Sequence, residues 1–322
     1  RKKMILYQQL KNFSIYTNKK LLVIMLLGFS SGLPLLLTLS TLAIWLVEIG
    51  VTKTTIGFFA LVGLPYSLKF LWAPFMDNLK IPFFTNYLGR RRSWIILTQI
   101  LLISSLIFLG YSNPSVDLRL TVLAAVLVAF FSASQDIVID AFRVESLEKE
   151  LYGAGAGMYV FGYRIGMLVA GAGALYLATF YEWSIVYILM SLLILIGSFA
   201  ILFASEPEQN SLIDTQKKKN IFHWFNDSVI NPFRDFMKKG NWKIIILFVV
   251  LYKFGDALVS VMANPFYLEM EFSKIEIANV SKFFGFIATV TGALIGGVFV
   301  KQSGIFKSLL ACGILQMLSN LF

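Results

Sequence analysis

The sequence has little of what a soluble enzyme or a metalloprotein needs. Only 14% of its 322 residues are charged and 57% are hydrophobic, whereas about 25% of the residues in a soluble domain are charged. It holds one cysteine, Cys312, and one histidine, His223. A lone cysteine excludes an internal disulfide, and a lone histidine excludes a histidine metal cluster. We therefore predict a polytopic all-α membrane protein that is not an enzyme and has no cofactor and no metal.

The basic residues are unevenly distributed along the chain. The formal net charge is +10, but 21 of the 28 Lys and Arg fall in alternate segments assigned to the cytoplasm, against three in outer segments. This alternation follows the positive-inside rule, so we predict a cytoplasmic N-terminus and no nucleic-acid partner. The first apolar run continues for about 27 residues and therefore indicates a membrane span rather than a cleavable signal. The nine expected spans are about 21–47, 54–76, 94–111, 118–140, 154–180, 183–204, 243–269, 275–300 and 305–322.

The spans divide into two sets. We predict a six-helix N-terminal lobe over 1–204, a cytoplasmic linker with an amphipathic helix over 205–242, and an incomplete three-span C-terminal lobe over 243–322. Because the chain stops within the ninth expected span, we take the sequence as a fragment. Gly28–Pro34 interrupts the first span, since glycine and proline let a helix bend, and Gly32 and Pro34 are candidate conformational residues.

Two acids stand in the fourth expected span. Asp136 and Asp140 are four residues apart, so on a helix they share a face, with Gln135 beside them. A carboxylate in hydrocarbon costs several kcal/mol and usually faces a bundle interior or a watery cavity. The pair therefore indicates a path for protons or a polar solute. A plainer interpretation is that Asp140 only pairs with Arg143 or caps the helix.

Other charges are expected inside spans. Lys69 lies roughly 10 Å and Arg164 roughly 15 Å from the cytoplasmic side, at about 1.5 Å per residue, so a network with Asp136 is plausible. In the seventh span, Lys253 and Asp256 are three apart on one face. They would contact the substrate or form a self-neutralising pair. Tyr163 and Tyr252 are further candidates for substrate contacts, although aromatic residues of this kind also serve in plain packing.

Two spans carry small residues at every fourth position. One stripe includes Gly162 and Gly166, and the other includes Gly297. Such stripes let helices approach closely. They fit either a sliding contact between two lobes or static packing.

The segment between the second and third spans reads Asp77-Asn78, then Gly89-Arg90-Arg91-Arg92. It resembles the cytoplasmic signature of the major facilitator superfamily, but Ala73 replaces the first glycine, Asn78 replaces a basic residue, and an insertion precedes Gly89. Other stretches sharpen the resemblance to the bacterial muropeptide permeases of that superfamily. These stretches are 28–34, 55–59, 69–74, 132–137, 162–168 and 251–257.

The resemblance implies a major-facilitator-type bundle in the inner membrane that works as a proton-driven importer. Its implied cargo is anhydro-muropeptides, with or without a stem peptide, recovered for wall recycling, and in that family uptake influences β-lactamase induction. The acid of the Ser-Gln-Asp segment carries over to Asp136. We expect a monomer whose partners are this small molecule, protons and lipid. Alternatives are a transporter of acetyl-CoA or another organic anion, and a receptor that does not transport.

The expected roles fall into three groups. Proton coupling is assigned to Asp136, Asp140 and Lys69. Substrate binding is assigned to Gln135, Tyr163, Arg164, Tyr252, Lys253 and Asp256. Gating and conformational roles are assigned to Asp77, Gly89, Arg90, Arg91, Arg92, Gly32, Pro34, Gly162, Gly166 and Gly297.

Overall fold

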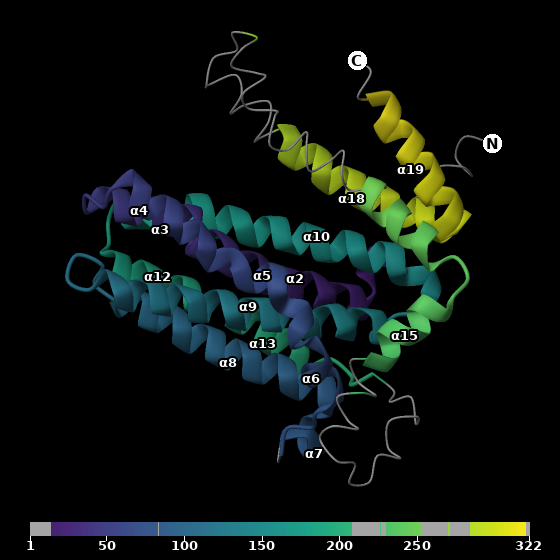
Figure 1. Cartoon of the computed structure of the whole chain (residues 1–322), viewed down its shortest axis with the longest axis horizontal. Coiled ribbons are helices and arrows are strands. Elements are labelled where there is room, and N and C mark those ends of the chain that lie inside the picture. The colour runs from purple at the N-terminus through teal and green to yellow at the C-terminus, as the bar shows by residue number, and fades with distance from the viewer. Residues whose placement is uncertain are drawn as a thin grey trace. The chain divides into compact units, whose positions relative to one another are not determined.

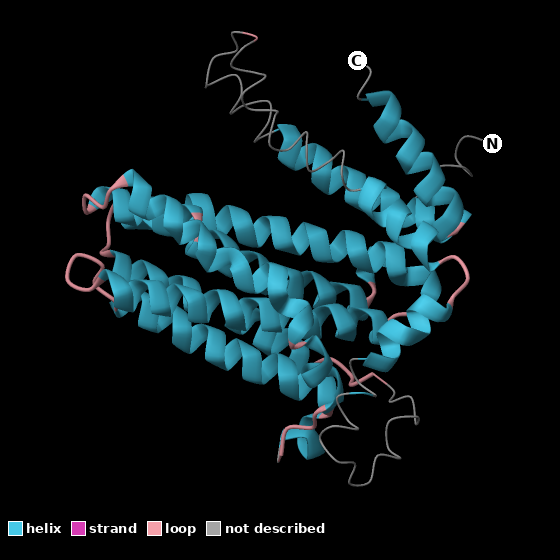
Figure 2. Ribbon diagram, in the orientation of Figure 1, coloured by secondary structure: helices cyan, strands magenta, loops and turns pink. Residues whose placement is uncertain are grey.

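The chain is all-helical wherever the structure describes it. The computed structural model describes residues 14–82, 84–207, 226, 230–252, 270 and 284–319, and no strand occurs in these ranges. Figure 2 shows helices joined by short loops. This agrees with the prediction of an all-α membrane protein.

The helices are labelled in Figure 1. The longer ones are α2 (Lys19–Thr38), α3 (Ser40–Glu48), α8 (Arg90–Tyr111), α9 (Leu118–Ser146), α10 (Tyr152–Leu168), α12 (Trp183–Leu193), α13 (Leu195–Leu202), α15 (Asn231–Lys238), α18 (Gly285–Ser303) and α19 (Ile305–Ser319). The shorter ones are η1 (Ser14–Thr17), α4 (Lys53–Phe58), η2 (Phe59–Gly63), α5 (Leu64–Leu68), η3 (Lys69–Leu71), α6 (Ala73–Asn78), α7 (Phe84–Leu88), η4 (Lys149–Leu151), η5 (Val169–Gly173) and α11 (Ala174–Ala178).

Seven helical stretches of the described chain are long and apolar enough to cross a membrane. Six of them match the first six expected spans, and the seventh is α18. Trp242–Tyr252 and Ile305–Ser319 are shorter apolar helices. Because parts of the last three expected spans lie outside the described residues, the total of nine spans stays a prediction. The six matching stretches are Lys19–Glu48, Thr54–Leu71, Arg90–Tyr111, Leu118–Ser146, Lys149–Ala178 and Trp183–Leu202.

The chain divides into two compact units. The first holds residues 1–209 together with 293–302, and the second holds 210–292 and 303–322. The first unit therefore contains all six N-terminal stretches. Within the second unit, the rings of Phe248 and Tyr252 pack in a tilted arrangement with centroids 5.5 Å apart.

The first span differs from its prediction. The segment Gly28–Pro34 does not interrupt it, because α2 runs without a break from Lys19 to Thr38 with Pro34 inside. The backbone departs from helical geometry only at Leu39, where φ is −112° and ψ is −90°. The hydroxyl of Thr38 donates to the carbonyl of Pro34 over 2.9 Å, so the end of α2 is held by a side chain. The bend therefore comes one turn after the proline.

Glycines bring α2 and α10 into backbone contact. A Cβ on Gly28 would lie 2.3 Å from the carbonyl oxygen of Tyr159, and one on Gly32 would lie 2.1 Å from that of Tyr163. From the other side, a Cβ on Gly162 would lie 1.9 Å from the carbonyl oxygen of Met25. Gly166 faces Phe29 in the same way, at 2.3 Å. The predicted stripe of α10 thus fits against the glycines of α2 inside one unit, as in static packing of transmembrane helices.

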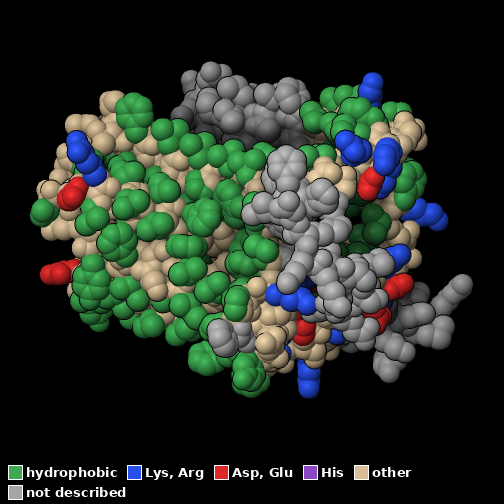
Figure 3. Space-filling model, turned by 60° about the horizontal axis from the view of Figure 1, so that its bottom comes forward, with side chains coloured by type: hydrophobic (Ala, Val, Ile, Leu, Met, Phe, Trp, Pro, Cys, Tyr) green, Lys and Arg blue, Asp and Glu red, His purple; other side chains and the backbone are tan. Residues whose placement is uncertain are grey.

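The hydrophobic core lies between these helices. Leu37, Leu102, Val128 and Tyr187 are fully buried members of one cluster. The hydroxyl of Tyr187 donates to the carbonyl of Leu37 over 2.8 Å, which satisfies its polar tip inside the core. Other large apolar side chains point outward, and Figure 3 shows a broad hydrophobic surface on the visible face. That surface is typical of helices that contact lipid.

We predict that Gly162→Ala destabilises the protein, whereas Gly296→Ala does not. The added methyl at residue 162 would collide with backbone, and overpacking of this kind costs about 1–3 kcal/mol. A Cβ on Gly296 meets nothing within 4 Å, and alanine favours a helix over glycine by up to about 1 kcal/mol. Thermal unfolding in detergent measures the difference. Equal midpoints for the two variants would contradict the close contact.

Candidate functional site

Helix α9 carries the candidate acid to the interior. Its start is capped by Asp117, whose Oδ1 accepts the backbone N–H groups of Arg119 and Leu120 at 2.9 and 3.1 Å. The helix then continues for 29 residues. Asp136, two thirds of the way along, is 9% exposed, so it does not face lipid. Its Oδ1 has no hydrogen-bond partner among the described residues.

Further polar groups surround Asp136. Gln135 Nε2 donates to the Ser31 hydroxyl of α2 over 3.4 Å, and Ser31 also lies close to Asp136. The Tyr66 hydroxyl of α5 is near Ser132. Helices α2, α5 and α9 thus converge on one polar centre.

Several oxygens at this centre lack partners. Four buried oxygens at this centre make no hydrogen bond to any residue that the structure describes: those of Tyr66, Ser132, Gln135 (Oε1) and Asp136 (Oδ1). An unsatisfied buried polar group costs about 1–3 kcal/mol. Most such groups in proteins are paired, so a concentration of exceptions marks a place for water, a proton or a polar ligand.

The predicted network of Lys69, Asp136 and Arg164 is present only in part. Lys69 is half-buried and close enough to Asp136 to interact with it electrostatically. Arg164 instead interacts electrostatically with its neighbour Tyr163. No ion pair joins Asp136 to either basic residue among the described contacts. Successive helical residues point in different directions, which is why Arg164 does not reach the acid.

Helix α10 contributes aromatic rings to the same centre. The rings of Tyr159 and Tyr163 lie 6.0 Å apart. Tyr159 is near both Ser31 and Asp136. Tyr163 also lies close enough to Asp136 to interact with it electrostatically. Tyr163, a predicted substrate contact, therefore lies near Asp136, and Tyr159 is an additional residue there.

Asp140 has a different environment from Asp136. Its Oδ1 lies 3.0 Å from Arg143 Nη2, and its side chain is 43% exposed. The Arg143 guanidinium carbon in turn lies 4.9 Å above the ring of Tyr159. The two acids share a helix face, as predicted, but Asp140 has the ion-pair partner of the plainer interpretation, whereas Asp136 forms no ion pair with any described residue.

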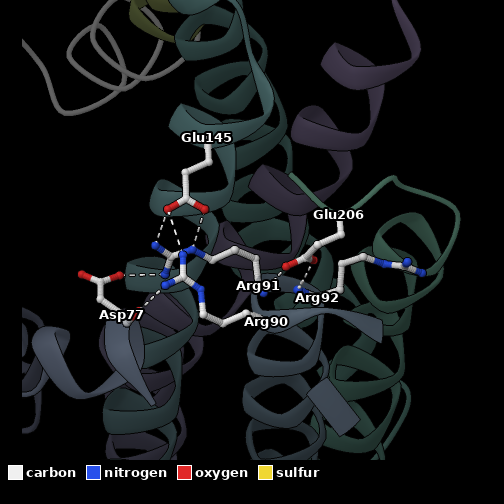
Figure 4. A network of polar contacts seen from close by, with 6 residues as sticks. All are labelled: Asp77, Arg90, Arg91, Arg92, Glu145 and Glu206. Carbon is white, nitrogen blue, oxygen red and sulfur yellow. Dashed lines mark hydrogen bonds and ion pairs between the residues drawn. The ribbon is translucent and has the colours of Figure 1, made fainter. Parts of the chain in front are cut away.

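A network of ion pairs closes the end of the bundle where α8 begins and α9 ends (Figure 4). Arg91 is buried, and its guanidinium reaches Asp77 Oδ1 at 2.7 Å and Glu145 Oε2 at 2.8 Å. Arg90 is also buried; it donates to the backbone carbonyl of Asp77 at 2.6 Å and pairs with Glu145 at 3.4 Å. Charge neutralisation by two carboxylates makes this burial possible.

The sequence suggested that Gly89–Arg92 lie in a loop, but the structure places these residues at the start of α8. Gly89 occupies the N-cap of α8 with φ +87°, and Arg90–Arg92 form its first turn. A glycine has no capping side chain, and Glu206 supplies one instead. Its carboxylate accepts the N–H groups of Arg91 and Arg92 at 2.7 and 3.1 Å. Negative charge at a helix N-terminus is favourable, so this distant cap explains why the helix starts here.

Arg92 completes a reciprocal contact between α8 and α13. Its guanidinium donates to the carbonyls of Ile201 and Leu202 at 3.1 and 2.6 Å. Those carbonyls end α13, where the last C=O groups of a helix lack N–H donors within the helix. Glu206 thus caps the start of α8, and Arg92 caps the end of α13. We call the Glu206 and Arg92 contacts the α8–α13 clasp.

The remaining predicted residues lie elsewhere. Gly297 packs against Gly153 and Ala154 of α10 within the first unit. Tyr252 belongs to the second unit and is not placed relative to Asp136. Lys253 and Asp256 lie outside the described residues.

Sequence reasoning missed six residues of these two clusters, one of which is Ser31. Tyr66, Ser132 and Tyr159 are of types common in apolar spans, so no local pattern separates them from packing residues. Glu145 and Glu206 give a weak signal, because each is an acid beside the end of a span. Only the folded arrangement shows their partners.

Apolar helices around a buried acid, with ion pairs at one end, are features of a polytopic membrane protein with a polar centre among its spans. The major facilitator superfamily profile matches residues 16–322. The chain belongs to the major facilitator superfamily, which is a family of transporters.

Within that superfamily the chain is similar to AmpG proteins. It is 39% identical over 311 residues to "Putative transporter AmpG 4" of Rickettsia conorii, covering 95% of this chain and 73% of that protein. It is 41% identical over 308 residues to "Anhydromuropeptide permease" of Escherichia coli K12, covering 95% of this chain and 60% of that protein. "Putative transporter AmpG 1" of Rickettsia prowazekii is 35% identical over 97% of this chain and 77% of its own length. These findings confirm the resemblance predicted from the motifs.

We predict that Tyr66→Phe leaves stability unchanged or slightly raised while it lowers transport. The hydroxyl has no hydrogen bond to lose, and removing an unsatisfied buried group is neutral or favourable. Tyr187→Phe is the matched control, because that hydroxyl donates to Leu37 and its loss should cost about 1 kcal/mol. Thermal midpoints and uptake are measured together. If Tyr66→Phe lowered the thermal midpoint and left uptake normal, the Tyr66 hydroxyl would contribute to stability and not to transport.

We also predict that Glu206→Ala lowers the thermal midpoint more than Glu150→Ala does. Loss of an N-cap costs about 0.5–2 kcal/mol, whereas Glu150 is an exposed acid in η4. Both changes remove one negative charge, so net charge is matched. Equal midpoints would show that the α8–α13 clasp adds nothing to stability.

Proposed function

We propose that the protein is a proton-coupled secondary transporter that imports anhydromuropeptides across the inner membrane, with its N-terminus in the cytoplasm. The cargo follows from the 41% identity to a protein named anhydromuropeptide permease. The observation that carries the coupling mechanism is Asp136, a buried acid with an unpartnered oxygen.

Asp136 is suited to carry a proton. A buried carboxylate without a bonded counterion is a costly charge, and protonation removes that cost. The positive charge of Lys69 lies near enough to stabilise the Asp136 carboxylate after it has released its proton. An equilibrium between these two states can be tipped by access to water from one side or the other.

The substrate would bind beside this acid. Sugar hydroxyls can donate to the free oxygens of Gln135 and Asp136, and they can accept from Tyr66 and Ser132. Tyr159 and Tyr163 offer ring faces that can cover a sugar. One ligand could thus satisfy the oxygens that the protein leaves without partners.

We propose that the N-terminal lobe, residues 1–204, rocks against the C-terminal spans to expose this centre alternately to each side. Each pH unit of gradient supplies about 1.4 kcal/mol, and each 100 mV of membrane potential about 2.3 kcal/mol per charge. Together they are sufficient to accumulate a dilute sugar. The ion pairs of Arg90 and Arg91 would brace the cytoplasmic side through the cycle.

We predict that Asp136→Asn abolishes gradient-driven uptake, whereas Asp140→Asn keeps it. Asparagine has nearly the shape of aspartate but binds no proton at neutral pH. Asp140 is the matched control, because it lies one turn away on the same helix and already has Arg143 as a partner. The measurement is accumulation of labelled anhydro-disaccharide in vesicles with an imposed proton gradient, with and without an uncoupler.

Four results would contradict part or all of this proposal. Uptake by Asp136→Asn equal to the parent, or uptake that ignores the uncoupler, would reject proton coupling at this residue. Binding without accumulation would indicate a receptor. Accumulation of acetyl-CoA in preference to the disaccharide would replace the cargo and leave the transport mechanism intact.

A further inference from the structure

The second helical stretch has few buried contacts where it carries Lys69. This stretch and α6 after it are built from short α and 3-10 pieces, and 3-10 geometry inside a helix often marks a hinge. Residues 63–75 include no buried side chain, although Val62 before them and Met76 after them are buried. A segment with few buried contacts shifts easily. Other interactions must therefore hold Lys69 in place.

Trp72 supplies such interactions. Its indole N–H donates to the Ser134 hydroxyl of α9 over 3.0 Å. Its ring centroid lies 4.8 Å from that of Phe130, which is one turn earlier on α9. The Ser134 hydroxyl donates in turn to the Phe130 carbonyl over 2.7 Å, which leaves its oxygen free to accept from the indole. A hydrogen bond and a ring contact thus attach Trp72 to α9.

The backbone connects Trp72 to Lys69. The N–H of Trp72 donates to the carbonyl of Lys69 over 3.3 Å and closes the turn η3. On the other side, Ser134 lies two residues before Asp136 on the continuous helix α9, so helix geometry sets the spacing of these two residues. One chain of contacts therefore links the lysine on one stretch to the acid on another.

The position of Lys69 matters because it is a positive charge close to Asp136. Within the described ranges, the other titratable groups that face this acid are Asp140 of α9, Tyr66 of α5, and Tyr159 and Tyr163 of α10. Tyrosines are neutral near pH 7, and Asp140 is paired with Arg143. The distance from Lys69 to Asp136 therefore governs how readily the acid releases its proton.

We propose that Trp72 is a positioning residue, which sets the distance between Lys69 and Asp136 and so determines how tightly the acid holds its proton. This inference rests on the proposed function, in which Asp136 carries the coupled proton. Trp72 itself touches neither the proton nor the substrate. It acts through Lys69, by holding the turn η3 against α9.

The test measures protonation of Asp136 without transport. Dicyclohexylcarbodiimide reacts with protonated carboxyl groups in apolar surroundings. The purified protein in detergent is treated at a series of pH values, and peptide mass spectrometry gives the fraction of Asp136 that is modified. Asp136→Asn provides the background. Because no gradient and no cargo are used, the result does not depend on whether the protein imports anhydromuropeptides.

Two variants that break the same hydrogen bond should behave alike. Trp72→Phe should raise the pH of half-maximal modification by about half a pH unit, the order expected when a charge pair in a protein separates by roughly 1 Å. Ser134→Ala should give the same shift, because it removes the acceptor and keeps the ring. The double variant should shift no further than either single change.

Two further variants separate positioning from a general loss of packing. Trp183→Phe is the matched control, because its indole N–H also donates to a side chain, Glu48 Oε2, over 2.7 Å; its half-maximal pH should equal that of the parent. In a Lys69→Met background, Trp72→Phe should cause no shift, because the charge that it positions is gone. Thermal midpoints show that each variant is folded.

Three outcomes overturn the proposal. An unchanged half-maximal pH in both Trp72→Phe and Ser134→Ala would show that the bond does not influence the acid. An equal shift in Trp183→Phe would make the effect one of general packing. A shift that persists without Lys69 would mean that Trp72 does not act through the lysine. None of these results decides the import function, which uptake by Asp136→Asn tests separately. If Trp72→Phe does not fold, Ser134→Ala decides the proposal alone.

Discussion

The backbone contact between α2 and α10 is the constraint on which the candidate site depends. The carbonyl oxygens that Gly28 and Gly32 touch belong to Tyr159 and Tyr163, the two rings beside the acid. Between those glycines, Ser31 faces Gln135 and Asp136. Because no side chain separates the helices there, their backbones are in direct contact. Small residues here therefore position polar ones.

The first unit contains two contrasting sets of buried polar groups, one with close partners and one without. At the end where α8 begins, Asp77, Arg91, Glu145 and Glu206 hold one another or free backbone groups in short contacts. Around Asp136, buried oxygens are left without partners. In the first arrangement the buried Nε of Arg90 lacks a partner within the described residues, whereas the second leaves four oxygens without one. Burial alone does not separate the two, since Arg91 and Asp136 are both buried.

Much of the fold could be predicted from the sequence, because hydropathy and charge asymmetry depend on local composition. The first six expected spans match helical stretches, and the motifs identified the superfamily. The burial of Asp136 followed from the cost of a charge in hydrocarbon. The partner of a small-residue stripe did not follow, since Gly162 and Gly166 would look the same against any helix. The cap of α8 was also beyond sequence reasoning, because Glu206 is 115 positions from Arg91.

The α8–α13 clasp has a mechanical consequence. Glu206 is followed by Pro207, where the described part of this lobe ends, and its carboxylate is bound to the first turn of α8. Tension from the chain beyond Pro207 would therefore be carried into the third span as well as the sixth. The two spans would therefore move together, because the hydrogen bonds from Arg92 to the carbonyls of α13 also join them.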